Sequence, residues 1–261
     1  MNSDSHNARI PRPGSWRALV WKAWRESRNR YFAALGLLLI LVGYTVLSGP
    51  QFLEGIAINH PDEPLTYSGY IWVSLIDFYL QGFWIACAFI LGLGGIWRER
   101  ATGVATFTLS LPVTRKRLVL TRAAVAIVEA FVIALLSFLL IPFFSAMSGY
   151  RYPLAQSFTF GFLLAVGGLL FVCFSLLLSS LFEGEYTAFV LGICAIAIAF
   201  FAFKARSIHR WSIFDMMSGA RHIDPNTHLL RSMPWAGLSI SLLISILLLS
   251  TSIEITRSRD F

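Results

Sequence analysis

Six apolar segments, each long enough to cross a lipid bilayer, dominate this sequence. A membrane-crossing helix needs about 20 mainly apolar residues, and the segments that qualify are 31–49, 70–97, 118–147, 158–182, 186–203 and 235–255. Only 13% of the 261 residues are charged, against roughly 25% in a typical soluble domain. The sequence therefore predicts an all-α integral membrane protein with a single transmembrane domain over residues 1–261.

The positions of Lys and Arg predict the orientation of the six spans. Fifteen of the 21 Lys and Arg residues lie in the two termini and in the connections 98–122 and 183–185, which share one side of the membrane. Because cytoplasmic loops carry the excess of positive charge, we expect both termini in the cytoplasm. The net charge of +7 is then a sign of topology, and no nucleic-acid partner is predicted.

The 204–234 loop opposes this orientation, because it holds five of the six basic residues on the other side. It would move inside if 158–203 crossed only once, as a helix about twice as long as the bilayer is thick. "FEGEY" at 182–186 interrupts that run with two carboxylates, so six spans are retained. Within 204–234, "HRWSIFDMMSGARH" is compatible with a short helix that enters the outer leaflet or with a packed surface loop.

A basic, tryptophan-rich stretch precedes the first span. Residues 1–14 are expected to be a flexible cytoplasmic tail, and 15–30, "SWRALVWKAWRESRNR", begins with Ser15, a good N-cap. Trp16 and Trp24 fall on one helical face and Arg25 lies mostly on the other. This pattern is typical of an amphipathic helix that lies in the membrane interface, although an ordinary positive flank that fixes topology would carry the same charges.

Two acidic residues lie well inside the predicted spans, Asp77 and Glu129. A charge at mid-bilayer costs about 2.5–3.5 kcal/mol on insertion scales, so such residues usually face protein or a water-filled cavity. Both residues are candidates for a polar pathway or a substrate contact. The alternative for each is a structural hydrogen bond between helices, for example with Ser or Thr.

Motifs for catalysis by the chain itself are missing from the sequence. It contains no G-x-x-x-x-G-K-[ST], no H-E-x-x-H and no G-x-S-x-G. His222 and His228, with Asp215 and Asp224, have no metal-binding spacing. Cysteines occur only in apolar runs, as core-type residues (Cys87, Cys173 and Cys194). We therefore predict no enzyme, no resident metal and no bound cofactor for this chain.

The connection between the second and third spans is long, basic and partly apolar. It reads "WRERATGVATFTLSLPVTRKRLVLTR" over 97–122. A short helix before Pro112 would place Val104, Phe107, Leu109 and Leu111 where lipid does not cover them, and exposed apolar surface rimmed by charge is typical of a binding site. A linker packed tightly on the bundle would also explain the apolar residues, but not the length of the segment.

The residues of this connection resemble the signature of the type-2 permeases of ATP-binding-cassette exporters. In that family an acidic residue, a Gly-Thr pair and a Leu-x-x-x-Pro-[Val/Ile]-[Ser/Thr]-Arg motif follow the second span. The matching positions are Glu99, Gly103, Leu109, Pro112, Val113, Thr114 and Arg115. The chain has Thr102 before the glycine and Val104 after it, Ala101 near the position of a second acidic residue, and Arg122 in place of a lysine.

The resemblance implies a permease subunit of an ATP-driven exporter in the inner membrane of a bacterium. It would pair with a second copy or a homologous permease and bind a separate cytoplasmic ATPase subunit, which carries the ATP and Mg²⁺. The coupling helix, seated in a groove of that ATPase, would use Glu99, Gly103, Phe107, Leu109, Pro112 and Arg115. The N-terminal helix would be the connecting helix, and 204–234 an outer re-entrant region.

Three other classes of function stay open at this point. A membrane scaffold or assembly protein would have the same spans without an ATPase partner. A secondary transporter would contain inverted repeats and helices broken at mid-membrane. A membrane-embedded enzyme would need a catalytic pair of residues that the motif search does not find.

Overall fold

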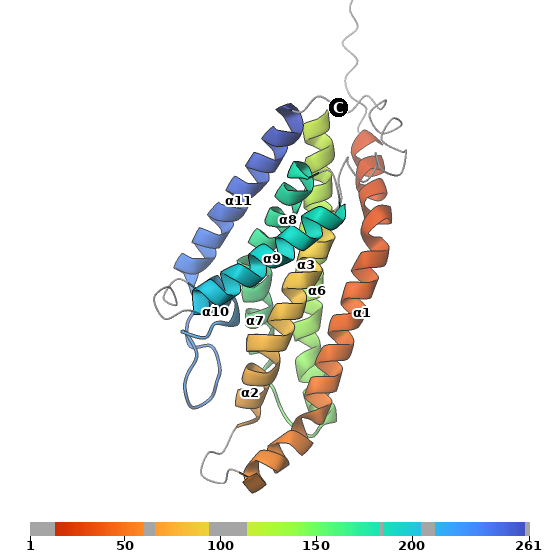
Figure 1. Cartoon of the computed structure of the whole chain (residues 1–261). Coiled ribbons are helices and arrows are strands. Elements are labelled where there is room, and N and C mark those ends of the chain that lie inside the picture. The colour runs from red at the N-terminus through yellow and green to blue at the C-terminus, as the bar shows by residue number, and fades with distance from the viewer. Residues whose placement is uncertain (1–13, 60–65, 94–113, 183–184, 205–211, 259–261) are drawn as a thin grey trace, which may run out of the picture.

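A computed structural model of the chain describes residues 14–59, 66–93, 114–182, 185–204 and 212–258. These residues form helices (Figure 1) with the following bounds: α1 (Gly14–Asn59), α2 (Tyr67–Tyr70), η1 (Ile71–Leu80), α3 (Gln81–Gly92), α6 (Arg115–Met147), α7 (Leu154–Gly167), α8 (Leu169–Leu181), α9 (Glu185–Lys204), α10 (Ile213–Ser218) and α11 (Trp235–Ser258). The predicted all-helical fold is confirmed for this part of the chain.

Six of these helical stretches are long and apolar enough to cross a membrane, as predicted. They are Trp16–Gly55, Tyr67–Gly92, Lys116–Met147, Leu154–Leu181, Tyr186–Phe203 and Trp235–Ser258, called spans 1 to 6 below. The start of α1, the start of α6 and the end of α11 lie at the same end of the bundle (Figure 1). We call this the terminal end.

The helix α1 joins residues 15–30 to the first span without a break. It runs through 46 residues, about 69 Å at 1.5 Å per residue, against a hydrocarbon core of about 30 Å. No Gly or Pro occurs between residues 15 and 35, so nothing in the sequence breaks the helix at residue 30. Residues 15–30 are therefore an extension of span 1 rather than a separate helix.

Span 4, made of α7 and α8, is the centre of the bundle. In its most apolar stretch 72% of the residues are buried, against 11% in span 5, which is α9. α9 crosses the other helices obliquely (Figure 1). The largest fully buried side chains come from spans 1 to 4 and include Leu38, Trp84, Phe89, Phe138, Phe160 and Leu163. The helices at the edge, α1, α9 and α11, keep apolar side chains exposed, as expected for a surface that lipid covers.

Small residues allow the spans to approach closely. Gly168 separates α7 from α8, and a Cβ there would overlap the Trp84 ring of α3. The Trp84 Nε1 atom donates to the Ala130 carbonyl at 3.2 Å, so this ring connects spans 2, 3 and 4. Ser241 of α11 donates to the Gly167 carbonyl at 2.7 Å and so satisfies a backbone acceptor at the irregularity, as lipid requires.

Substituting Gly168 is expected to destabilise the bundle. Gly168→Ala forces the Trp84 ring to move, and overpacking of this kind costs about 1–3 kcal/mol. We predict a thermal midpoint in detergent several degrees lower than that of the natural protein. Gly36→Ala is the control, because a Cβ at Gly36 meets no atom within 4 Å. Equal midpoints for the two variants would contradict this account of the packing.

The middle of span 2 departs from α-helical geometry. η1 is a π-helix of ten residues, between α2 and α3, and it contains Asp77. π-helical turns are rare and frequently occur at functional sites. Nothing in the sequence pattern predicted this segment.

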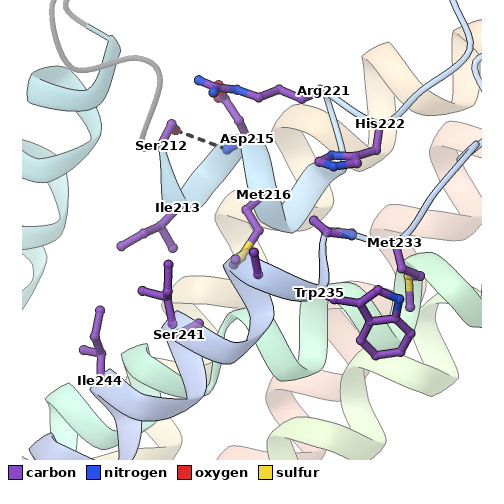
Figure 2. A pocket seen from close by; sticks show the side chains of 14 residues that line it. Ser212, Ile213, Asp215, Met216, Arg221, His222, Met233, Trp235, Ser241 and Ile244 are labelled. Atoms are coloured by element: carbon purple, nitrogen blue, oxygen red, sulfur yellow. Dashed lines mark hydrogen bonds and ion pairs between the residues drawn. The ribbon is translucent and has the colours of Figure 1, made fainter.

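The short helix α10 is held against span 2 at both of its ends. Gln81 Nε2 donates to the Phe214 carbonyl at 2.8 Å, and Trp72 Nε1 donates to the Ser218 carbonyl at 3.1 Å. Gly219 follows with φ of 71°, a left-handed turn that ends the helix. The described part of 204–234 therefore contains a short helix, and this helix packs on span 2 (Figure 2). Its entry into the outer leaflet stays a prediction.

Tyrosines join spans 2 and 3 at the end opposite the termini. The Tyr67 ring stacks on Tyr150 with centroids 4.3 Å apart, and its hydroxyl donates to Ser145 Oγ at 2.8 Å. Burial raises the pKa of the Tyr152 hydroxyl, in the connection between α6 and α7, above its usual value. This phenol therefore stays neutral at physiological pH.

Candidate functional site

Most of the predicted coupling helix lies outside the described residues. This applies to Glu99, Gly103, Phe107, Leu109 and Pro112, so their assignment stays a prediction. The structure describes the two points where the segment joins the bundle. Span 2 ends as a helix at Gly92, five residues earlier than predicted, with Leu93 as its C-cap. Arg115 is the first residue of α6, after the extended Thr114.

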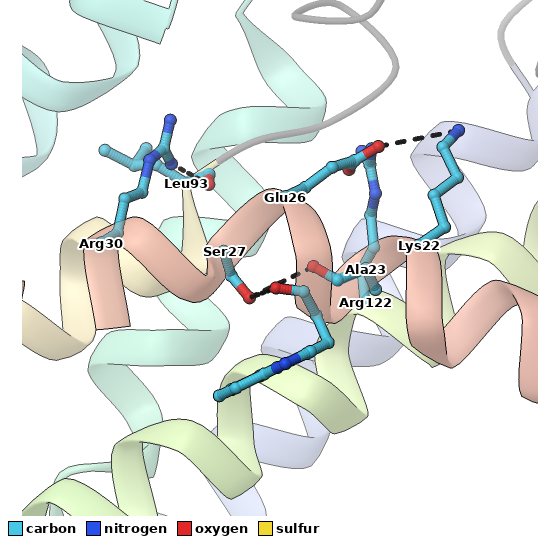
Figure 3. A network of polar contacts seen from close by, with 8 residues as sticks. Lys22, Ala23, Glu26, Ser27, Arg30, Leu93 and Arg122 are labelled. Atoms are coloured by element: carbon cyan, nitrogen blue, oxygen red, sulfur yellow. Dashed lines mark hydrogen bonds and ion pairs between the residues drawn. The ribbon is translucent and has the colours of Figure 1, made fainter. Parts of the chain in front are cut away.

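Arg30 of α1 holds the point where the chain leaves span 2. Its Nη1 atom donates to the Leu93 carbonyl at 2.7 Å and lies 3.4 Å from the Ile90 carbonyl (Figure 3). The last carbonyls of a helix have no partner within the helix, and the helix dipole favours a cation there. Arg30 therefore caps span 2 from a neighbouring helix.

Residues of α1 also contact the start of span 3. Arg122 of α6 donates to Glu26 at 2.9 Å, and Lys22 lies 3.8 Å from the same carboxylate (Figure 3). The Arg117 guanidinium lies 4.6 Å from the centre of the Trp16 ring. Glu26 therefore pairs with a basic residue two turns into α6 and ties α1 to that helix.

Glu129 is buried one level deeper between the same two helices. Its side chain lies in α6 with 2% of its surface exposed, and Ser27 Oγ donates to its Oε1 atom. The other carboxyl oxygen, Oε2, is buried and has no hydrogen-bond partner among the residues that the structure describes. Of the two roles predicted for Glu129, the structure has the hydrogen bond between helices, with a serine as partner.

We name these contacts the α1 clamp, made of Arg30, Glu26, Ser27, Arg122 and Glu129. On α1 they lie within residues 26–30, and they fix this helix to span 2 and span 3, on either side of the 94–113 segment (Figure 3). The motifs in the sequence indicated no contact for Ser27 or Arg30. A possible signal was their spacing, since Ala23 and Ser27 are four residues apart, as are Glu26 and Arg30.

The predicted interfacial residues of α1 divide between protein and the surface. Leu19 and Ala23 are buried, and both line a small crevice against Leu118 and Thr121 of α6. Trp16 is 41% exposed, whereas Trp24 is half-buried with its ring 5.2 Å from that of Tyr31. Arg25 is exposed. The apolar stripe that we expected to face lipid therefore packs partly on span 3.

Asp77 lies apart from the α1 clamp, on the exposed side of η1. It is at the edge of a groove of about 440 Å³ between span 2 and α9. The groove wall is otherwise almost entirely apolar and includes Phe78, Phe83, Phe200 and Phe214. Asp77 and Glu129 therefore do not form one site, and only Asp77 faces a groove.

The other candidates from the sequence remain separate. Cys87 and Cys173 are buried free thiols, and Cys194 is an exposed one. Among the residues that the structure describes, no three His, Cys, Asp or Glu side chains gather as metal ligands would.

The hydrogen bond between Ser27 and Glu129 is expected to stabilise the pairing of α1 with α6. Ser27→Ala and Glu129→Ala should each lower the thermal midpoint in detergent, and the double variant should lose less than the sum. We expect a coupling of about 0.5–3 kcal/mol, typical of residues in one polar network. Ser250→Ala is the control, because Ser250 is exposed and bonds within its own helix. Strict additivity would show that the two side chains do not interact.

No protein-family model and no curated protein sequence matches this chain. The functional argument therefore rests on the motif in 99–115 and on the geometry around it.

Proposed function

We propose that the chain is the membrane permease subunit of an ATP-driven exporter of the ATP-binding-cassette type. In this proposal a separate cytoplasmic ATPase binds the 94–113 segment, and two permease chains together enclose the export path. The membrane lies across the six spans with the terminal end in the cytoplasm, in agreement with the excess of Lys and Arg there.

The observation that carries the proposal is the α1 clamp. The segment with the exporter signature leaves span 2 at Leu93, which Arg30 caps, and returns to span 3 close to Arg122, which pairs with Glu26. A displacement of the segment would therefore reach spans 1, 2 and 3 together. A mere linker would not require both of its flanks to be fixed to the same helix.

Span 2 offers a route for this displacement through the membrane. Helices in lipid satisfy their own backbone hydrogen bonds and move as stiff elements. Trp72 and Gln81 attach the middle and outer parts of span 2 to α10. When the ATPase subunits close on ATP, we infer that spans 1 to 3 move as one body and shift α10. The ATPase can bias this motion only through contacts that differ between the two states.

The second copy would lie against the face made by α1, span 2 and α9. These helices are neighbours on one side of the bundle (Figure 1). The face exposes Asp77 within an apolar surface, and a carboxylate in a span is normally shielded from lipid by protein or water. Pairing through this face would place Asp77 in a path between the two copies.

Secondary transport is the second candidate, because the structure contains two helix irregularities inside spans. One is the junction of α7 and α8 at Gly168, and the other is the π-helix η1 with Asp77. Transporters driven by ion gradients bind their substrates at such breaks. Transport by the purified chain alone, driven by an ion gradient without ATP, would support this class and exclude the first.

Replacing apolar or acidic residues of the coupling segment should uncouple the exporter. We expect Leu109→Asp and Glu99→Lys to abolish co-purification of an ATP-binding-cassette ATPase with the tagged chain from its native membranes. Membrane insertion and thermal stability should stay unchanged. The matched control is Leu154→Asp, at a leucine that is 62% exposed at the opposite end of the bundle.

Two results would contradict the exporter proposal. One is that the natural chain, extracted gently, never brings an ATPase with it, which would favour a scaffold protein. The other is that Leu109→Asp and Leu154→Asp retain the ATPase equally, which would remove the 94–113 segment as its docking site.

Pairing through the proposed face is testable by cross-linking. Phe78 of η1 is 62% exposed and Phe158 of α7 is 51% exposed, and the two elements have different main neighbours, α1 and α3 for η1 and α6 for α7. In a Cys194→Ala background, Phe78→Cys should form a cross-linked dimer with a short bis-maleimide in native membranes, and Phe158→Cys should not. The reverse result would place the second copy elsewhere.

A further inference from the structure

A second cavity lies beside α10, at the end of α11 that is away from the termini. It has a volume of about 470 Å³ and is bounded by α10, by the chain that leads into α11, and by the first turns of α11 (Figure 2). This volume is within the range of small-molecule sites, about 300–1,000 Å³. The cavity is separate from the α1 clamp and from the groove beside Asp77.

The wall of the cavity has a charged side and an apolar side. Asp215, Arg221 and His222 gather along one side, and Arg221 Nη2 lies 3.6 Å from Asp215 Oδ2 (Figure 2). Met216, Ile240 and Ile244 belong to the apolar side. A ligand with both charged groups and hydrocarbon would match the two sides of the cavity.

The position of the cavity along α11 matches the surface of a membrane. Trp235, the first residue of α11, is 65% exposed, and tryptophan prefers the boundary between lipid and water. Ile244 is nine residues further along the span, about 14 Å at 1.5 Å per residue. Ile240 between them is 48% exposed, so the apolar side is accessible from the lipid around α11.

The charged side is held in place by the packing of α10. Gly219 turns the chain back after α10, which brings Arg221 to Asp215. Trp72 and Gln81 fix the carbonyls at both ends of the helix. A Cβ at Gly237 would meet the Met216 sulfur at 2.6 Å, so α11 packs directly on the Met216 side chain. The site is therefore preorganised rather than formed by a loose loop.

We propose that this cavity binds one zwitterionic phospholipid with a primary amine, of the phosphatidylethanolamine type. Its phosphate lies beside Arg221 and His222, its ammonium group beside Asp215, and one acyl chain along Ile240 and Ile244. The negative phosphate of the headgroup then faces the positive Arg221, and the positive ammonium group faces the negative Asp215. An anionic lipid would leave Asp215 facing a negative headgroup.

The choice of a lipid over a peptide or a soluble anion follows from the access route. The apolar side continues along the exposed face of α11, where hydrocarbon chains of the bilayer already lie. A soluble anion has no hydrocarbon with which to contact the apolar side. The proposal concerns binding alone, and it goes beyond the exporter function without depending on an ATPase.

Lipid binding is measured by native mass spectrometry of the purified full-length chain. The probes are phosphatidylethanolamine, phosphatidylcholine and phosphatidylglycerol with identical acyl chains. We expect phosphatidylethanolamine to bind about tenfold tighter than the other two, the difference made by one charge-assisted hydrogen bond. Asp215→Asn should abolish the preference over phosphatidylglycerol. Arg221→Gln should weaken binding of phosphatidylethanolamine and of phosphatidylglycerol about tenfold.

Matched variants separate this site from general contact with lipid. Ile240→Trp fills the apolar side and should weaken binding of phosphatidylethanolamine, whereas Ile246→Trp on the same helix lies outside the cavity and should not. Arg151→Gln removes a positive charge at the same end of the bundle without touching the cavity. A variant is compared only if its thermal midpoint equals that of the natural chain, which shows that it is folded.

The proposal is overturned by equal affinity for the three lipids, by tighter binding of phosphatidylglycerol, or by Ile240→Trp and Ile246→Trp having the same effect. Equal affinity would indicate a surface that accepts any amphiphile. Preference for phosphatidylglycerol would indicate a site for anions based on Arg221 alone. None of these results bears on ATPase binding at the other end of the bundle.

Discussion

The contact between the first part of α1 and the first part of α6 determines how the terminal end of this protein is built. Hydrocarbon supplies no hydrogen bonds, so a polar side chain at membrane depth needs a protein partner. Glu129 finds this partner in Ser27, and the charges nearer the surface pair as Glu26 with Arg122. These contacts hold α1 against span 3, and Arg30 then reaches the end of span 2. Spans 1 to 3 and the start and end of the 94–113 segment are thereby joined.

Away from this end, close packing replaces polar contacts. Lipid gives helices no hydrophobic reason to associate, so small residues that let helices approach are decisive. Gly168 admits the Trp84 ring, and Gly192 of α9 admits Phe89 in the same way. Gly92 of α3 lies against Ser175 of α8, which donates to the Phe89 carbonyl at 2.6 Å. Span 2 thus packs on span 4 through the contact of α3 with α8.

The sequence predicted those features that depend on length and composition, and missed those that depend on a neighbouring helix. Six apolar runs of sufficient length predict six spans whatever their packing. The continuity of α1 was also readable, because no Gly or Pro occurs between residues 15 and 35. The partner of Glu129 depends on how α1 rotates against α6, and the π-helix depends on packing around span 2. No local sequence pattern predicts the partner of Glu129 or the π-helix. The assignment of residues 99–115 as a coupling segment still rests on the motif alone.

The place of Asp77 follows from what is fixed on either side of it. Span 2 is capped by Arg30 at the terminal end, and Trp72 and Gln81 tie it to α10 near the two ends of η1. A π-helix has wider turns than an α-helix and marks a point where regular geometry gives way. Because Trp72 and Gln81 tie both ends of η1 to α10, a displacement of span 2 that starts at the terminal end reaches η1 and α10 together. Asp77 lies in η1 and beside the groove. In the proposed exporter, a movement that starts at the ATPase would therefore change the surroundings of the Asp77 carboxylate in the export path. Span 2 would transmit this movement without a break in its helix.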